Sequence, residues 1–232
     1  MPGHDYQATI DDLPELVDLY YSDLLQTDLS MRRLYPHGIT SKLRAKGIAE
    51  WKASLHNPDE VEEIWRTIGY RTDGNRDDIA AFARFKVRND DIFSNGLQAG
   101  SSKNNKTYPT ASVGRIRNRA AVIKLANAAN DRLEDFKISH IGGGHIFIDP
   151  LVVSPKYSDK GYGPLLVWYS QEFAKERGLP CYAISVPETK ALYLNEGFKV
   201  VGSYDECLEA PGKVGGRKDK QFRERSLMEW RP

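Results

Sequence analysis

The sequence has few cysteines, no long hydrophobic run and almost no net charge. Cys181 and Cys207 are its only cysteines, so they cannot form a disulfide framework, and this scarcity suits a reducing compartment. No stretch approaches the roughly 18 uninterrupted apolar residues that span a bilayer. The first residues lack the basic segment and apolar run of a secretory signal. These absences predict a cytoplasmic protein without a membrane anchor.

The charge balance excludes the partners that bind mainly by electrostatic attraction. Lys and Arg number 33 against 32 Asp and Glu, which leaves a formal net charge of +1. We therefore expect neither nucleic acid nor a membrane as a partner. The segment from His140 to His145 encloses three glycines, but no further Cys or His cluster supports a metal site, so we expect a turn and no metal. The oligomeric state is not encoded in any pattern that we recognise.

Apolar spacing predicts an α/β fold with a mixed sheet and helices on both faces. The expected strands are 6–10, 63–71, 79–87, 145–153, 181–186, 199–207 and 225–231, and the expected helices are 11–26, 40–55, 117–136, 163–177 and 188–196. Asp11 or Asp12 is the expected cap of the first helix. We expect a single domain over 1–232 with an insertion at about 90–144, of which 94–114 has the composition of a flexible loop.

The strongest strand, 145–153, contains an irregularity. Apolar residues on both of its faces predict a central, covered strand. Pro150 conflicts with a continuous ladder because it has no N–H to donate. We therefore expect a bulge or a splay of the strands at Pro150.

A glycine-bearing turn follows this strand and leads into a helix. The turn runs over 158–163, and the first N–H groups of the helix have no acceptors within it. Gly161 and Gly163 let backbone amides approach an anion, and Lys160 adds a positive charge. This arrangement suits a pyrophosphate, although a tight turn that needs positive φ angles would carry the same glycines.

Two motifs in this region resemble the Gcn5-related N-acetyltransferase (GNAT) family. The first is Val153-Ser-Pro-Lys-Tyr157 with Ser158-Asp-Lys-Gly161-Tyr-Gly163, which is similar to the family's Val-x-Pro-x-Tyr/Phe and Gln/Arg-x-x-Gly-x-Gly/Ala pattern. The second is Ala191-Leu-Tyr-Leu-Asn-Glu-Gly-Phe198, which is similar to its Ala-x-x-Tyr-x-x-x-Gly-Phe helix end. The close match covers roughly 145–204, and the resemblance implies a mostly antiparallel central sheet.

The resemblance also implies a cofactor, acetyl-CoA, and a set of residues that bind it. These residues are Val152, Val153, Ser158, Asp159, Lys160, Gly161, Tyr162, Gly163 and Pro164. The N–H groups near Val152 and Val153 would serve the pantetheine amides and the thioester oxygen, where charge develops during the reaction. Two residues depart from the family pattern: Ser158 replaces Gln or Arg, and Pro164 removes one N–H. Both would lower the affinity for the cofactor without removing the amide cradle.

The implied reaction is direct attack of an amine on the acetyl thioester. Tyr193 matches the family tyrosine that protonates the leaving thiolate; the alternative is an aromatic side chain packed on the inner face of its helix. Asp149 is the first candidate for the general base, with a structural ion-paired aspartate as the equal alternative. His145 is the second candidate, although a lone histidine is more often structural.

The acceptor is the least constrained part of the prediction. We expect a small-molecule primary amine, because the inserted loop has the length to enclose a small pocket. A protein or peptide N-acetyltransferase is the nearest alternative, since an extended substrate needs an open groove. A non-catalytic acyl-CoA-binding regulatory protein of the same fold is the third, which Ser158 and Pro164 favour and Tyr193 opposes.

Overall fold

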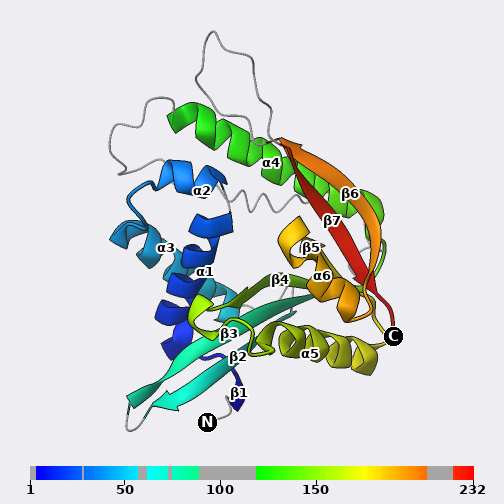
Figure 1. Ribbon diagram of the computed structural model, residues 1–232, viewed down its shortest axis with the longest axis horizontal. Coiled ribbons are helices and arrows are strands. Elements are labelled where there is room, and N and C mark those ends of the chain that lie inside the picture. Colours follow the sequence, from blue (N-terminus) through cyan, green and yellow to red (C-terminus); the bar gives the residue numbers. More distant parts are fainter. Residues whose placement is uncertain (1–3, 28, 57–61, 73–74, 89–118, 208–221) are drawn as a thin grey trace.

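The computed structural model describes residues 4–27, 29–56, 62–72, 75–88, 119–207 and 222–232. Its strands form one seven-stranded sheet in the order β1-β2-β3-β4-β5-β7-β6 (Figure 1). The strands are β1 (His4–Gln7), β2 (Glu62–Thr72), β3 (Asn75–Arg88), β4 (His145–Val153), β5 (Cys181–Ser185), β6 (Lys199–Cys207) and β7 (Phe222–Trp230). β4 and β5 are parallel, and the other neighbouring pairs are antiparallel. The predicted mixed, mostly antiparallel sheet is therefore confirmed.

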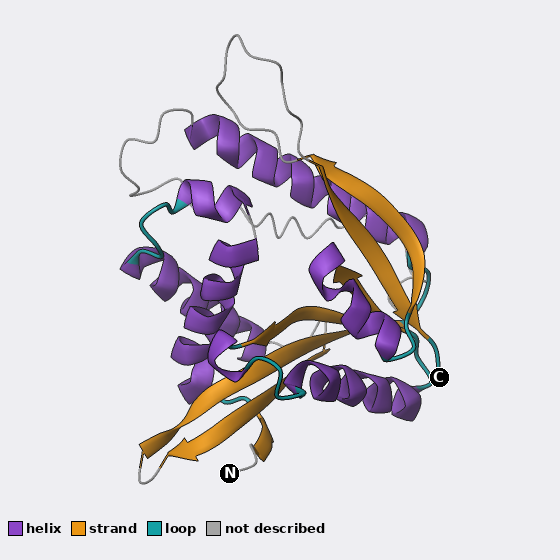
Figure 2. Ribbon diagram, in the orientation of Figure 1, coloured by secondary structure: helices purple, strands orange, loops and turns teal. Residues whose placement is uncertain are grey.

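Helices cover both faces of this sheet (Figure 2). The helices are α1 (Leu13–Thr27), α2 (Leu29–Leu34), α3 (Ser41–His56), α4 (Arg119–His140), α5 (Tyr162–Arg177) and α6 (Pro187–Asn195). Phe82 of β3 packs in a cluster with Leu16 of α1, whereas Phe85 packs in another with Leu166 of α5. The two phenylalanines thus lie on opposite faces, as their odd spacing predicts. Each contributes about 2–3 kcal/mol of hydrophobic stabilisation.

The irregularity predicted at Pro150 is present in β4. Ala83 pairs with Leu151 and Phe85 pairs with Ile148, so Arg84 alone faces both Asp149 and Pro150 across the ladder. This two-against-one pairing is a β-bulge. On the other side of β4, the parallel pairing with β5 covers only Ile146–Ile148. The sheet therefore separates into two halves from Asp149 onward, and Figure 2 shows these halves diverging.

Several expected elements differ from the observed ones. β1 ends at Gln7, and Ile10–Asp12 form a 3-10 turn instead of the end of a strand. Thr9 caps this 3-10 turn, and Asp12, which directly precedes α1, accepts a hydrogen bond from the Thr9 N–H at 2.7 Å. α2 is absent from the prediction, because its six residues are too few to show a helical period. The segment 94–114 lies outside the described residues.

Candidate functional site

The turn between β4 and α5 leads into a helix whose first N–H groups have no acceptors within the helix. The Ser154 N–H donates to Ala80 O at 2.8 Å, which continues the ladder with β3, and a 3-10 turn over Pro155–Tyr157 follows. Asp159 and Gly161 both have positive φ angles, 61° and 80°. The first N–H of α5 that bonds back is that of Leu165, to Gly161 O at 3.1 Å. The preceding turn of the helix therefore offers its N–H groups and the positive end of its dipole to an anion.

The two glycines of this turn have different physical roles. A Cβ added at Gly161 would meet no atom within 4 Å, so this glycine is required for its left-handed backbone and leaves open space beside it. A Cβ at Gly163 would lie 3.5 Å from Leu192 of α6, an ordinary contact. Gly163 is buried, whereas Ser158, Asp159, Lys160 and Pro164 are exposed. The open side of the turn is therefore at Gly161.

An anchor that the sequence analysis missed holds this turn against β3. The Tyr157 hydroxyl donates to the Asp78 carboxylate at 2.6 Å, and the Lys156 ammonium donates to the same oxygen. These two donors lower the pKa of Asp78 below its usual value. The same contact raises the pKa of Lys156 to about 12. No local signal identifies Asp78, because it lies 78 residues from Lys156.

Beyond the bulge, one edge of β4 is free of β5. The Ser154 N–H points to β3, and successive N–H groups along a strand alternate in direction. The N–H of Val152 therefore points to β3, and the N–H groups of Leu151 and Val153 point into the opening between β4 and β5. Of the two valines predicted to bind the cofactor, Val153 presents its N–H to this opening, while the buried Val152 side chain packs with α1.

Tyr193 of α6 lies in the core cluster beneath the same opening. It is buried, and its ring packs edge-on against Phe198 with centroids 5.4 Å apart. Burial raises the pKa of its hydroxyl, and the negative charge of Asp149 acts in the same direction. Within the described part of the chain, the hydroxyl forms no hydrogen bond. The Tyr193 hydroxyl thus retains its proton at neutral pH.

Asp149 lies at the bulge in a partly buried ionic cluster. Its carboxylate is 2.9 Å from the Lys86 ammonium and 3.7 Å from the Arg84 guanidinium. The Arg84 side chain also donates to the backbone oxygen of Asp149 at 2.6 Å and lies over the Trp51 ring. The arrangement is that of an ion-paired aspartate, and it places a carboxylate where the two halves of the sheet separate.

His145 lies at the other end of β4. Its ring is buried, Nδ1 is 2.9 Å from the oxygen of Gly143, and the ring packs edge-on against Tyr182. Eight residues separate it from Val153, which corresponds to about 26 Å along a strand. The structure therefore brings Asp149, Tyr193 and the β4–α5 turn together around the opening, and it leaves His145 outside this group.

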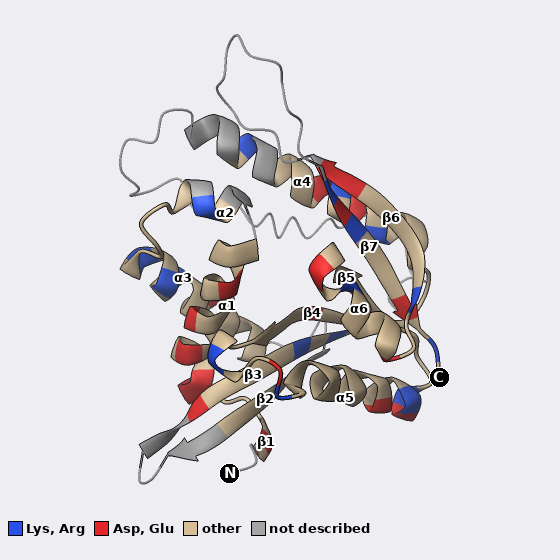
Figure 3. Ribbon diagram, viewed as in Figure 1, with Lys and Arg blue, Asp and Glu red and all other residues tan. Residues whose placement is uncertain are grey.

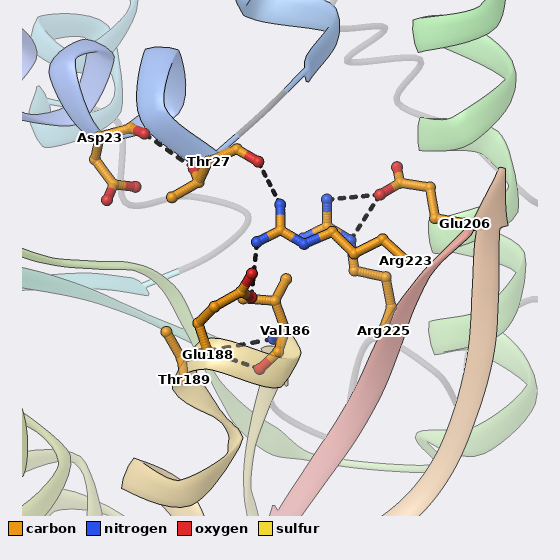
Figure 4. Close-up of polar contacts among 8 residues, drawn as sticks. All are labelled: Asp23, Thr27, Val186, Glu188, Thr189, Glu206, Arg223 and Arg225. Atoms are coloured by element: carbon orange, nitrogen blue, oxygen red, sulfur yellow. Dashed lines mark hydrogen bonds and ion pairs between the residues drawn. The ribbon is translucent and has the colours of Figure 1, made fainter. Parts of the chain in front are cut away.

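Across the opening, an arginine of β7 links the end of α1 to the start of α6 (Figure 4). The Arg223 guanidinium donates to the backbone oxygen of Thr27, at the end of α1, and to Glu188 of α6 at 2.9 Å. The neighbouring Arg225 pairs with Glu206 at 2.8 Å. Figure 3 shows acidic residues along α1 and at the start of α6. Arg225 begins the last predicted strand, and no local pattern in the sequence identifies Arg223.

Comparisons with known proteins agree with this geometry. Residues 120–198 match the model of the acetyltransferase (GNAT) family. An uncharacterized N-acetyltransferase of Staphylococcus aureus strain N315 is 27% identical over 161 residues, which span 65% of this chain and 100% of the relative.

Solved structures show the same fold at low identity. An agmatine N-acetyltransferase mutant in its apo form has a TM-score of 0.60 at 10% identity, with 100% of each chain covered. The Salmonella typhimurium protein yncA, solved with its cofactor acetyl-CoA, has a TM-score of 0.52 at 12% identity, covering 100% of this chain and 94% of that one. None of the described helices is long and apolar enough to cross a membrane. The N-terminal turn of α5 and part of the opening beside β4 thus lie in the segment that matches the acetyltransferase (GNAT) family, and the whole chain shares its fold with solved N-acetyltransferases.

Proposed function

We propose that this protein transfers the acetyl group of acetyl-CoA to the primary amine of a small molecule. The observation that carries the proposal is the position of the anion-binding turn at the end of β4, where that strand separates from β5. A pyrophosphate bound at Gly161 would leave the rest of an extended cofactor to run along the free edge of β4. The open space beside Gly161 fits such a group.

Backbone groups bind the cofactor in this proposal. The N–H groups at the start of α5 hold the pyrophosphate, together with the exposed Lys160. The departures Ser158 and Pro164 shorten one side chain and remove one N–H, and the amides of Gly161 and Gly163 remain. The N–H groups on the free edge of β4 hold the pantetheine amides and stabilise the charge that develops on the thioester oxygen.

Acetyl-CoA supplies an activated acetyl thioester. The amine nitrogen forms a C–N bond to the carbonyl carbon while the C–S bond breaks, and the thiolate leaves with the electron pair. Tyr193 donates its proton to this thiolate, because its buried hydroxyl retains the proton and has no other partner among the described residues. The amine loses one proton as the thiolate gains one from Tyr193. The protein returns to its starting state when Tyr193 takes up a proton again.

Asp149 remains our first candidate to accept the amine proton, directly or through water. It lies at the opening, although Lys86 and Arg84 both contact its Oδ2 atom. His145 is the second candidate, and its position about 26 Å along β4 from Val153 favours Asp149. The pH–rate profiles of Asp149→Asn and His145→Gln variants distinguish the two candidates. Loss of the general base is expected to remove the acidic limb of the profile, whereas loss of the other residue leaves that limb in place.

A compact acceptor is favoured over a peptide by the Arg223 bridge. This side chain joins the end of α1 to the start of α6, so it crosses the approach that an extended chain would need. The agmatine N-acetyltransferase of similar fold is named for a small amine. A non-catalytic role is less favoured, because Tyr193 is retained with an unbonded hydroxyl.

Two measurements test the proposal. Calorimetric titration with acetyl-CoA is expected to show binding, and the absence of heat at millimolar ligand would contradict the cofactor site. A screen of primary amines for release of free CoA thiol is expected to find turnover with small amines. Turnover with peptides alone would support the protein or peptide alternative.

A further inference from the structure

Asp23 differs from the other carboxylates around the opening. Four of the others are held in ion pairs: Asp149 with Lys86, Glu188 with Arg223, Glu206 with Arg225, and Glu224 with Lys190. Among the described residues, no cation lies within ion-pair distance of the Asp23 carboxylate, and Figure 4 shows no contact from it to Arg223. A partly buried carboxylate without a counter-ion lowers stability unless a ligand compensates for it.

Arg223, the described cation whose charge acts on Asp23, is committed elsewhere. Arg223 donates one nitrogen to the backbone oxygen of Thr27 and another to Glu188. Its charge acts on Asp23 from a distance and lowers the pKa of that carboxyl, as does the Thr27 hydroxyl, but burial has the larger effect and raises it. Among the residues that the structure describes, the environment of Asp23 is thus short of positive charge.

Asp23 lies on the side of α1 away from α3. Asp18, on the same helix, pairs with Arg44 of α3 at 2.6 Å. Five residues correspond to about 140° around an α-helix, so Asp23 is directed away from α3. The Thr27 oxygen, one turn later, reaches Arg223 and through it α6. Asp23 therefore borders the approach between α1 and α6.

The distance along α1 separates Asp23 from the reacting centre. Leu16 packs in the cluster that contains Val152, next to the free edge of β4. Asp23 follows Leu16 by seven residues, or about 10 Å along the helix axis. A group held at Asp23 is therefore not the amine nitrogen at the thioester but a second group, some distance further out.

We infer that Asp23 binds a second cationic group of the acceptor, so that the substrate is a diamine or another amine with a second positive charge. This inference rests on the proposed function. The reacting amine lies at the opening near Tyr193, and the Asp23 carboxylate forms an ion pair with the distal cation. Asp23 is then a specificity-determining residue: it selects among amines without taking part in the chemical step.

The test compares putrescine with butylamine, a monoamine of the same chain length, in the full-length protein. For the wild type, kcat/KM is expected to be at least about tenfold higher for putrescine, the factor that one charge-assisted contact supplies. Asp23→Asn is expected to abolish this preference by lowering the putrescine value alone. Asp18→Asn removes a charge from the same helix on its α3 side and is expected to keep the preference. Melting temperatures of both variants confirm that they are folded.

A binding measurement distinguishes failure of the inference from failure of the proposed function. Putrescine is titrated calorimetrically into wild type and Asp23→Asn in the presence of CoA. Binding that weakens about tenfold or more in the variant supports the inference even if no amine releases CoA, in which case the proposed activity fails. No binding to the wild type, equal binding to both proteins, or a preference for butylamine or γ-aminobutyrate over putrescine overturns the inference.

Discussion

The two sides of the opening would hold their ligands with different parts of the chain. On the β4–α5 side, the groups available are backbone N–H groups at the start of α5 and on the free edge of β4. On the α1–α6 side, they are side chains from distant segments, such as Asp23 and the bridging Arg223. A site built from backbone groups needs a particular chain geometry, so it constrains a continuous stretch of sequence. A site built from side chains needs particular residues at only a few positions, so the residues next to them in the sequence can vary.

The largest effect is expected from Tyr193→Phe, which tests whether the two sides meet at one reacting centre. Loss of the hydroxyl is expected to lower kcat about a hundredfold or more, because the leaving thiolate loses its proton donor. Affinity for acetyl-CoA, measured by calorimetry, is expected to be unchanged.

Tyr204→Phe is the matched control for this substitution. Tyr204 is half-buried, and burial raises the pKa of its hydroxyl to about 12, but its ring packs on Phe136 of α4 instead of lying at the opening. Its kcat is expected to equal that of the wild type. Similar losses in both variants would remove Tyr193 from the mechanism.

The backbone side is tested by Gly161→Ala, with Gly178→Ala as its control. Both glycines flank α5, both have positive φ angles (80° and 63°), and a Cβ at either would meet no atom within 4 Å. Each substitution is expected to lower the free energy of unfolding by about 1 kcal/mol, since a side chain disfavours this backbone region.

Only Gly161→Ala is expected to weaken acetyl-CoA binding, by about tenfold in a calorimetric titration, because the added methyl group and the displaced N–H groups lie where the pyrophosphate would bind. Equal affinities of the two variants for acetyl-CoA would mean that Gly161 is needed for the backbone conformation of the turn and not for binding the cofactor.

The anchor of the turn is tested by Asp78→Asn, with a smaller expected effect of about threefold on the KM for acetyl-CoA. The folded pKa of Asp78 lies below its unfolded value, so its contribution to stability is present above about pH 4 and is lost as the pH falls through the folded pKa. The difference in melting temperature between wild type and variant is therefore expected at pH 7 and should shrink toward pH 3. A difference that persists at low pH would contradict the role of the carboxylate.

The smallest effect is expected from Asp23→Asn on stability. The folded pKa of Asp23 is raised, so the charged form is favoured less in the folded state than in the unfolded state at neutral pH. Replacing it with a neutral side chain is expected to raise the melting temperature by a few degrees at pH 7. A lower melting temperature would indicate that Asp23 stabilises the fold instead of serving a ligand.

The backbone side was largely predictable from sequence because its determinants are local. The bulge follows from Pro150 within a nine-residue apolar strand, and the turn follows from Gly161 at the junction of that strand and a helix. The bounds of β4 agree with the predicted ones for the same reason. The catalytic and cofactor-binding roles of these residues remain predictions, which the variants above address.

The amino-acid sequence by itself determined the resemblance to the GNAT family, most of the order of the elements and the position of the glycine-bearing turn, because periodicity, a proline and two glycines act on their immediate neighbours. Only the tertiary structure decided that Asp78 holds this turn, that Asp149 is paired with Lys86 and Arg84, and that Arg223 bridges α1 and α6. These contacts join residues between 35 and 196 positions apart. Which side chains meet over such separations depends on how the two halves of the sheet diverge, and no local pattern contains that information.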